Sequence, residues 1–485
     1  MIWIHDLPDD RGGQAAARRG GLLFGTLYFG LVFHWLLVAL VWFSPLAFVG
    51  FFAALGLVVA MTSVFAGLLH FALVRVRAPI WLALPVTWTA LEWSRAHLPS
   101  TLAFPWLGLG TSLTGFPELV GIAEVVGARG VTFWIALVNG VLAGLVLSVR
   151  ERRSWLPWAA TAAVLLVGPM GWGVWRAHSL EMFSVGRIAV VQPNIAQSIK
   201  LDPALVQDST FASLDRLIGR IEPGGAALVV LPEVTLPLRP YDEGATAQMA
   251  RIQSYSREVG TPILFGAYGY EPLDGDASVP FNSAFLMEPQ GLTDFQYDKR
   301  YLVPVVERAP FVPAAVFRGL PHSGEYGVGQ GWPLAEAGQA LFGVLICYES
   351  TYPEASRQFR LEGADVLVNI TNDAWYGRED SYARTTALWQ HPAHMVMRAI
   401  ENRVGVARSA NTGISLFVDP VGRVYNPSPL FEEDVRVDEV FTSDIVTFYT
   451  RFGDVVGGAC ALVSLLLLAS ALRPRQSLDR PGRLA

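Results

Sequence analysis

Long apolar stretches constrain this 485-residue chain more than any other feature of its sequence. An α-helix rises about 1.5 Å per residue, so a run of roughly 20 apolar residues is long enough to cross the hydrocarbon core of a bilayer. The sequence therefore predicts an integral membrane protein with about six transmembrane helices. These stretches cover residues 21–43, 46–74, 79–98, 128–149, 155–175 and 455–472.

Composition agrees with this interpretation. Charged residues make up 16% of the chain, whereas about 25% is usual for soluble proteins. A secretory signal peptide does not fit, because the apolar stretches repeat along the chain. No basic block of the kind that binds nucleic acid is present, so we expect no nucleic-acid partner. Of the two cysteines, Cys347 lies in the polar region and Cys460 in an apolar run, so no structural disulfide is expected.

Basic residues predict how the chain is oriented in the membrane. Six spans place both termini on the same side, and cytoplasmic loops carry an excess of Lys and Arg. The loop at residues 44–45 on the opposite side has no basic residue. We therefore expect both termini in the cytoplasm of a multi-pass plasma or inner membrane protein, with the long polar region outside. The basic clusters on the cytoplasmic side are residues 11–19, 75–77, 150–153 and 473–483.

The polar region is large enough for one complete domain. We expect a membrane domain at 1–176, an extracytoplasmic domain at 177–451, and a last span with a cytoplasmic tail at 452–485. In the polar region, runs rich in Val and Ile alternate with helical patterns, which is typical of an α/β fold. Strands are predicted at 187–192, 227–231, 262–268, 283–287, 340–346, 365–370 and 414–418, and helices at 203–221, 245–259, 352–362 and 382–404.

Three strand ends carry reactive side chains: Glu233 after 228–232, Lys299 after a further strand-like segment at 295–298, and Cys347 after 345–346. Because sites form at the carboxyl ends of strands in α/β sheets, the three could converge on a thiol acyl-transfer site. The Glu would take the thiol proton, and the Lys would stabilise an oxyanion. A helix that starts after Cys347 would favour the thiolate. Each residue also has a structural interpretation, as a cap, a surface charge and a small core residue respectively.

The segments around these residues resemble the Glu-Lys-Cys pattern of the nitrilase superfamily. They are Leu-Pro-Glu at 231–233, Asp-Lys-Arg-Tyr-Leu-Val-Pro at 298–304 and Ile-Cys-Tyr-Glu at 346–349. The apolar flanks narrow the resemblance to the apolipoprotein N-acyltransferases, its membrane-embedded branch. Further similar segments lie at 191–195, 372–377, 398–402 and 411–415, and at 91–93, 104–106 and 130–134 in the apolar part.

This resemblance implies a fold and an activity. The fold would be an α-β-β-α sandwich inserted between transmembrane helices. The enzyme would move a fatty acyl chain from a phospholipid, through a cysteine thioester, to the N-terminal amine of a diacylglyceryl-cysteine apolipoprotein. No cofactor and no metal are implied. The alternatives are a membrane-tethered amidase that uses the same three residues, and a catalytically inactive scaffold.

The resemblance also assigns roles by position. Glu233 would be the general base, Lys299 the oxyanion partner and Cys347 the nucleophile. The backbone N–H of Tyr348 would complete the oxyanion hole. Supporting residues at the site would be Glu307, a further acidic group, Tyr348 and Glu349 at the border of an acyl pocket, and Trp375 on a loop near the entrance.

The chain departs from the family pattern at three points. Val306 and Arg308 stand where the family tends to have Gly and Tyr, and Leu201 stands where Trp is common. The family usually has eight spans, and the start of this chain aligns with the third. We therefore expect the coding DNA upstream of Met1 to encode two more apolar spans in frame.

Overall fold

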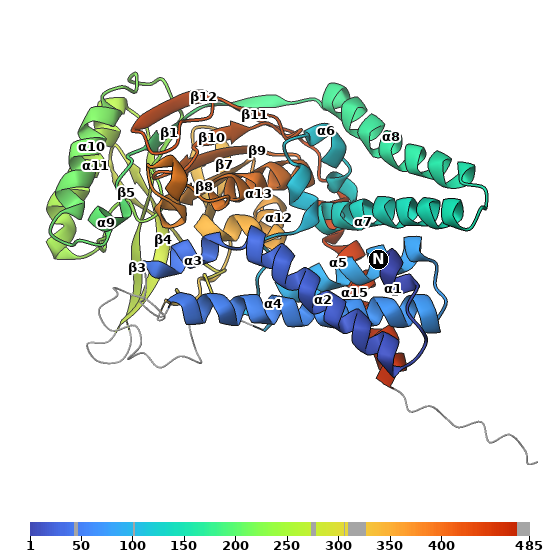
Figure 1. The fold of residues 1–485 in the computed structure, drawn as a ribbon. Helices are drawn as coiled ribbons and strands as arrows, with labels where there is room; N and C mark the ends of the chain where they lie inside the picture. Colours follow the sequence, from blue (N-terminus) through green and yellow to red (C-terminus); the bar gives the residue numbers. More distant parts are fainter. Residues whose placement is uncertain (43–46, 100–101, 273–277, 305, 309–325, 473–485) are drawn as a thin grey trace, which may run out of the picture.

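The computed structural model describes residues 1–42, 47–99, 102–272, 278–304, 306–308 and 326–472. A group of apolar helices packs against a layered α/β unit (Figure 1). The loop at 44–45, Val305 and the C-terminal basic cluster at 473–483 lie outside the described residues.

The α/β unit contains two six-stranded sheets. Each has parallel pairs at its centre and antiparallel pairs towards its edges. The first runs β12 (Asp434–Thr442), β1 (Phe183–Gln192), β2 (Leu228–Val230), β3 (Ile263–Pro272), β4 (Ser278–Glu288) and β5 (Gly291–Asp298). The second runs β11 (Val424–Tyr425), β10 (Leu416–Val418), β9 (Gly405–Ala410), β8 (Val366–Thr371), β7 (Ala340–Ile346) and β6 (Leu334–Ala337).

Alternating side chains of the central strands hold the layers together. Val229 packs with the outer helices of the first sheet, whereas Leu228 and Val230 join the core shared with the second sheet. This pattern produces the predicted α-β-β-α sandwich. Helices α10 (Val206–Ile218) and α11 (Thr246–Val259) cover the first sheet, and α12 (Pro353–Leu361) and α13 (Ala387–Asn402) cover the second.

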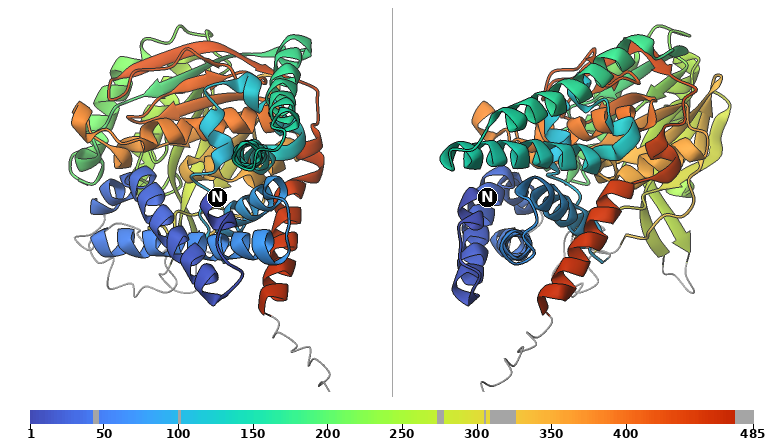
Figure 2. Two further views of the ribbon diagram at one scale, coloured as in Figure 1. Left: turned by 45° about the vertical axis from the view of Figure 1, so that its right-hand side comes forward. Right: turned by 90° about the vertical axis from the view of Figure 1, so that its right-hand side faces the viewer.

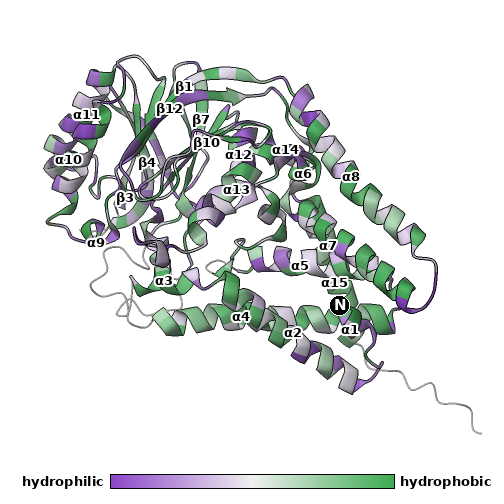
Figure 3. Cartoon of the chain, turned by 45° about the horizontal axis from the view of Figure 1, so that its top comes forward, coloured by the Kyte–Doolittle hydropathy of each residue, from purple (hydrophilic) through white to green (hydrophobic). Residues whose placement is uncertain are grey.

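The apolar helices lie to one side of the sandwich, and α15 extends away from it (Figure 2). Figure 3 shows that α4, α7 and α15 are apolar along most of their length, whereas α10 and α11 carry many polar residues. Helix α2 packs against α4, and α5 packs against both α7 and α15. Their bounds are α2 (Arg11–Val32), α3 (Trp35–Val41), α4 (Ala47–His70), α5 (Ile80–Ala96), α7 (Ala123–Arg150), α8 (Leu156–Ser179) and α15 (Val455–Leu472).

Length and composition identify fewer spans than the six expected. In the described chain, four helical segments are long and apolar enough to cross a bilayer, and the pair α2 and α3, bent by 58°, makes a fifth if counted as one span. The remaining expected span, at 79–98, corresponds to α5, which has only 17 residues and carries Glu92 and Arg95. The four segments are Ala47–Arg75, Ala123–Arg150, Leu156–Ser179 and Val455–Leu472.

The polar groups of α5 bind the loop that follows it. Glu92 accepts hydrogen bonds from the Leu109 backbone N–H at 2.9 Å and from the Thr132 hydroxyl at 2.8 Å. Arg95 donates from Nε to the Phe104 carbonyl at 3.1 Å and from Nη2 to the Trp106 carbonyl at 2.8 Å. Three of these contacts hold the loop at 104–109 on α5, and the fourth, from Thr132, joins α5 to α7.

A buried ion cluster joins the apolar helices to the sandwich. Glu124 on α7 accepts from Arg403 Nε at 2.8 Å and from Arg176 Nε at 2.9 Å through the same oxygen. Its other oxygen accepts from Trp172 Nε1 at 2.9 Å. Arg403 follows α13 and is 1% exposed, so its charge depends on Glu124 for compensation.

We predict that Glu124→Ala lowers the free energy of unfolding by about 3–5 kcal/mol, because it leaves the buried Arg403 guanidinium without a carboxylate. Thermal unfolding of detergent-solubilised protein, compared with the exposed-site control Glu181→Gln, measures the effect. Equal midpoints for both variants would contradict this assignment.

Candidate active site

Cys347 occupies a sharp bend between a strand and a helix. Strand β7 ends at Ile346, and the 3₁₀ helix Cys347–Thr351 begins at the next residue. Cys347 has φ +53°, a left-handed conformation that is uncommon for a residue with a Cβ and costs about 1–3 kcal/mol. The surrounding layers hold this strained residue in place, and its side chain is buried.

A second strand end brings an ammonium group between two carboxylates. Lys299 directly follows β5, and its side chain is 0% exposed. Its Nζ lies 2.9 Å from Glu307 Oε1 and 3.5 Å from Glu233 Oε1. Glu233 follows β2, so Glu233 and Lys299 come from the first sheet and Cys347 from the second. The structure therefore brings the predicted residues together between the two sheets.

Two asparagines hold the carboxylates in position. Asn282 on β4 donates from Nδ2 to Glu233 Oε1 at 2.8 Å and to Glu307 Oε1 at 3.1 Å. The backbone N–H of Asn372 donates to the other Glu233 oxygen at 2.9 Å. Each Glu233 oxygen thus has a fixed donor, which limits the rotation of the carboxylate.

The electrostatics of the cluster favour a protonated thiol. Burial raises the pKa of Cys347 well above its ordinary value, and the Glu233 charge raises it further, while Lys299 acts in the opposite direction. Burial lowers the pKa of Lys299, but the Glu307 and Glu233 carboxylates outweigh it, so the net shift is upward and the ammonium persists. The prediction that the helix start favours a thiolate was wrong, because burial dominates.

Glu349 connects the Cys347 bend to the Lys299 loop. One of its oxygens accepts from the Ile346 backbone N–H at 2.8 Å. The other accepts from the Tyr297 hydroxyl and the Arg300 backbone N–H, both at 2.8 Å, and from the Tyr301 N–H at 3.2 Å. Glu349 is fully buried, and burial raises its pKa even though these donors lower it. This geometry gives Glu349 a positioning role beside the predicted border of an acyl pocket.

Aromatic side chains from the apolar helices and their loops lie against the site. Tyr348 stacks on Trp106 with ring centroids 6.3 Å apart and lies 6.2 Å from the Phe104 ring. Its hydroxyl donates to the Ala103 carbonyl at 3.3 Å. Trp375, in the 3₁₀ turn Asp373–Tyr376, is half-buried and packs against the same core. The loop at 103–106 therefore forms one wall of the site.

Several residues at the site carry no recognisable pattern in the sequence. Asn282 lies in the middle of a strand, and Lys200 donates to the carbonyls of Glu233 at 3.2 Å and Val234 at 2.9 Å. Val234 has φ +40°, so Lys200 secures a strained turn directly after Glu233. His391 contacts the Cys347 carbonyl from α13, and the sequence pointed to that region only through the similar segments at 372–377 and 398–402, neither of which includes His391.

The fold and the site define the class of protein. Residues 187–448 match the family model described as carbon-nitrogen hydrolase, which agrees with the two-sheet sandwich. Residues 1–141 match the apolipoprotein N-acyltransferase N-terminal domain. The chain thus combines a carbon-nitrogen hydrolase domain with the helical region found in one branch of that class.

Proteins of similar sequence identify this branch of the carbon-nitrogen hydrolase class. An apolipoprotein N-acyltransferase of Geobacter metallireducens is 32% identical over 467 residues, which cover 94% of this chain and 87% of the relative. One from Ralstonia nicotianae is 32% identical over 407 residues, which cover 80% of this chain and 71% of the relative. The chain belongs to the apolipoprotein N-acyltransferase family. It is a membrane acyltransferase of lipoprotein maturation, as the resemblance implied.

Solved structures resemble the sandwich alone. A mutant of the amidase from Nesterenkonia sp. AN1, in complex with butyramide, is similar with a TM-score of 0.40 and 20% identity, covering 55% of this chain and 94% of that chain.

The raised pKa of Cys347 predicts slow alkylation at neutral pH. The thiolate is the reactive form, so the rate of reaction with iodoacetamide should keep rising with pH through 9. A Cys460→Ser background leaves Cys347 as the single thiol, and intact mass reports the modification. A rate that reaches its plateau near pH 7 would contradict a buried, protonated thiol.

Proposed function

We propose that Cys347 carries a fatty acyl chain between a phospholipid donor and the α-amine of a diacylglyceryl-cysteine apolipoprotein. In the first half-reaction, Sγ attacks the ester carbonyl, the ester C–O bond breaks, and lysophospholipid leaves. In the second, the amine attacks the thioester, the C–S bond breaks and an amide forms. A thioester lets two large lipid substrates use one carbonyl-binding site in turn.

Glu233 moves the protons in both half-reactions. It takes the proton of the Cys347 thiol and gives it to the departing lysophospholipid oxygen, then takes one from the attacking amine and returns it to the sulfur. Support comes from the charge balance of the site. Two carboxylates and one ammonium leave a net negative charge beside the thiol, so a thiolate forms only as a carboxylate accepts its proton.

Lys299 and the Tyr348 N–H stabilise the oxyanion of each tetrahedral intermediate. The ammonium is buried and held by Glu307, so it points into the site without reorganisation during the reaction. Glu307 also accepts from the Val303 N–H at 2.7 Å, which anchors it to the loop after Lys299. Glu307 is therefore proposed as the partner that positions the ammonium.

The observation that carries this proposal is that a loop bound by the apolar helix α5 forms one wall of the site. A sandwich of this class needs no membrane to act on a soluble amide, yet α5 binds the loop whose Trp106 and Phe104 rings pack on Tyr348, next to the nucleophile. Such a junction suits substrates whose acyl chains remain in the bilayer. Trp375 and Tyr348 are proposed to border the acyl chain.

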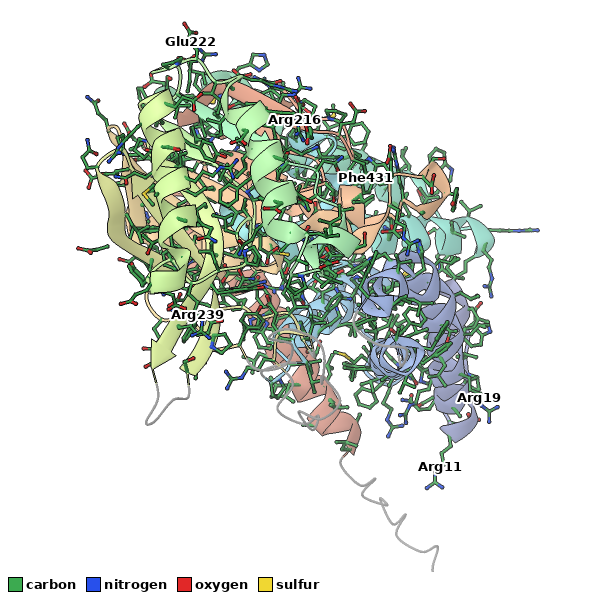
Figure 4. The ribbon with its side chains drawn as sticks, turned by 90° about the vertical axis from the view of Figure 1, so that its left-hand side faces the viewer. Arg11, Arg19, Arg216, Glu222, Arg239 and Phe431 are labelled. Atoms are coloured by element: carbon green, nitrogen blue, oxygen red, sulfur yellow. The ribbon has the colours of Figure 1, made fainter. Side chains whose placement is uncertain are left out.

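The proposed topology divides the chain at 176 and 451, with both termini cytoplasmic and residues 177–451 outside. Ion pairs support it: Arg75 lies 3.1 Å from Asp9, and Arg150 lies 2.5 Å from Asp6. The ends of α4 and α7 thus meet the N-terminal segment, which requires α5 to cross in the opposite direction to α7. In Figure 4, Arg11 and Arg19 lie far from Arg216 and Glu222 of the sandwich.

The proposal predicts a measurable transfer reaction. Purified enzyme given phospholipid and a diacylated lipopeptide should add one fatty acyl chain to the peptide and release lysophospholipid. Cys347→Ala should abolish the transfer, and Lys299→Met should slow it by ~10²–10³, the usual effect of losing an oxyanion donor. Mass spectrometry of the lipopeptide measures both.

Cys460→Ala is the matched control, because it removes the other thiol of the chain and should retain activity. Hydrolysis of a soluble amide without lipopeptide acylation would favour the amidase alternative. Absence of both reactions in the folded wild type would favour a scaffold.

A further inference from the structure

A chain of buried polar side chains ends on the backbone of the nucleophile. Arg408 Nη2 donates to Asp373 Oδ2 at 2.6 Å, and Asp373 Oδ1 lies 2.8 Å from His391 Nδ1. His391 Nε2 lies 3.1 Å from the carbonyl oxygen of Cys347. All three side chains are 0% exposed, and none belongs to the residues assigned to proton transfer or oxyanion binding.

The partners of the imidazole determine where its protons lie. The Cys347 carbonyl oxygen can only accept, so Nε2 carries a hydrogen. Asp373 is ionised: burial raises its pKa, but Arg408 and His391 outweigh this and hold the pKa below its ordinary range. Asp373 Oδ1 and Arg408 Nη2 lie 2.8 Å and 3.3 Å from Nδ1, so they hold the other side of the ring in place.

The hydrogen bond to the Cys347 carbonyl also determines the direction of the next N–H. In a trans peptide, the C=O and N–H of one unit point in opposite directions. Because the Cys347 carbonyl points at His391, the Tyr348 N–H points away from it. We propose that His391 is a positioning residue for the oxyanion hole, which holds the Cys347–Tyr348 peptide plane so that its N–H faces the reacting carbonyl. This inference rests on the proposed function.

The strained conformation of Cys347 persists only where surrounding contacts hold it. Its φ is +53°, and the hydrogen bond from His391 to its carbonyl is one such contact, which rotation of the Cys347–Tyr348 peptide unit would break. A rotated unit would present the Cys347 carbonyl oxygen to the substrate, and an acceptor there would repel the oxyanion. The His391 donor opposes that rotation because the carbonyl would lose a buried hydrogen bond.

Two aromatic rings, one from the loop at 104–109 and one from the turn at 373–376, seal the imidazole from water. Trp106 stacks on His391 with centroids 5.0 Å apart and planes at 30°, and Tyr376 lies edge-on at 5.8 Å. Trp106 Nε1 donates to Gln390 Oε1 at 2.9 Å, which fixes the indole over the ring. The positioning of the oxyanion hole is thus tied to the loop that α5 holds.

Two substitutions separate the roles of the two ring nitrogens. His391→Gln places an amide donor near the position of Nε2, so it can still reach the Cys347 carbonyl. His391→Asn places its donor nearer the position of Nδ1, and the shorter side chain does not reach that carbonyl. We expect His391→Asn to lower the rate constants of enzyme acylation and deacylation by ~10²–10³ without raising KM, and His391→Gln to retain rates within about tenfold.

The carbonyl stretch of the acyl-enzyme supplies a readout that a merely structural role would not move. Enzyme acylated with a ¹³C-carbonyl chain, without acceptor, is compared with the ¹²C form by difference infrared spectroscopy. The wild type and His391→Gln should show the downshift of a hydrogen-bonded thioester, and His391→Asn should show much less. A wild-type stretch and rate in His391→Asn would overturn the inference.

Equal slowing in both variants with an unchanged stretch would also overturn it. If His391→Asn does not fold, His391→Gln decides: loss of the downshift in that folded variant refutes the inference, and retention supports it. Failure of the wild type to form any acyl-enzyme refutes the proposed function instead, so the two outcomes are distinct.

Discussion

A buried ammonium group is the constraint on which the site depends. Lys299 is fully enclosed between the sheets, and an unpaired charge there would cost several kcal/mol. Glu233 and Glu307 compensate it, and Asn282 binds both carboxylates. The same arrangement keeps the Lys299 ammonium charged and the Cys347 thiol protonated. It also holds the Glu233 carboxylate where the proposed mechanism requires it to receive the thiol proton.

Buried polar contacts also connect the apolar helices to the site. Helix α5 carries Glu92 and Arg95, and these groups bind backbone atoms of the loop at 104–109. That loop places Trp106 against both Tyr348 and His391. A helix that is an impure apolar stretch in the sequence thus connects the apolar helices to the candidate site.

Periodicity and reactive strand ends predicted much of this architecture. All seven predicted strands correspond to observed ones, namely β1 to β4, β7, β8 and β10, because these central strands are continuous apolar runs. Strand β5 was recognised only at its end, at 295–298. Strands β9 and β12 were missed because Arg408, Asp434 and Glu439 interrupt their apolar pattern and find partners only in the folded protein. Strands β6 and β11 were missed because they have only four and two residues.

Only some residues of the candidate site could be predicted from the sequence. Glu233, Lys299 and Cys347 follow recognisable strands, and the structure brings them together. Asn282 and His391 act through contacts with residues distant in sequence, which no local pattern reveals. The sign of the Cys347 pKa shift was also inaccessible, because it depends on how completely the fold buries the thiol. The number of spans also differs from the prediction of six. Helix α5 is too short and too polar to be counted as a span by length and composition, although it packs against α7 and α15, which are counted.

The central claim is that Cys347 holds the acyl chain between two half-reactions. Rapid-quench intact mass spectrometry of the enzyme mixed with phospholipid alone tests it most directly. The account predicts a mass increase of one fatty acyl chain, removed by neutral hydroxylamine and absent in Cys347→Ala, with an equal amount of lysophospholipid released. A wild type that transfers acyl chains without any such adduct, together with an active Cys347→Ala, would contradict the account.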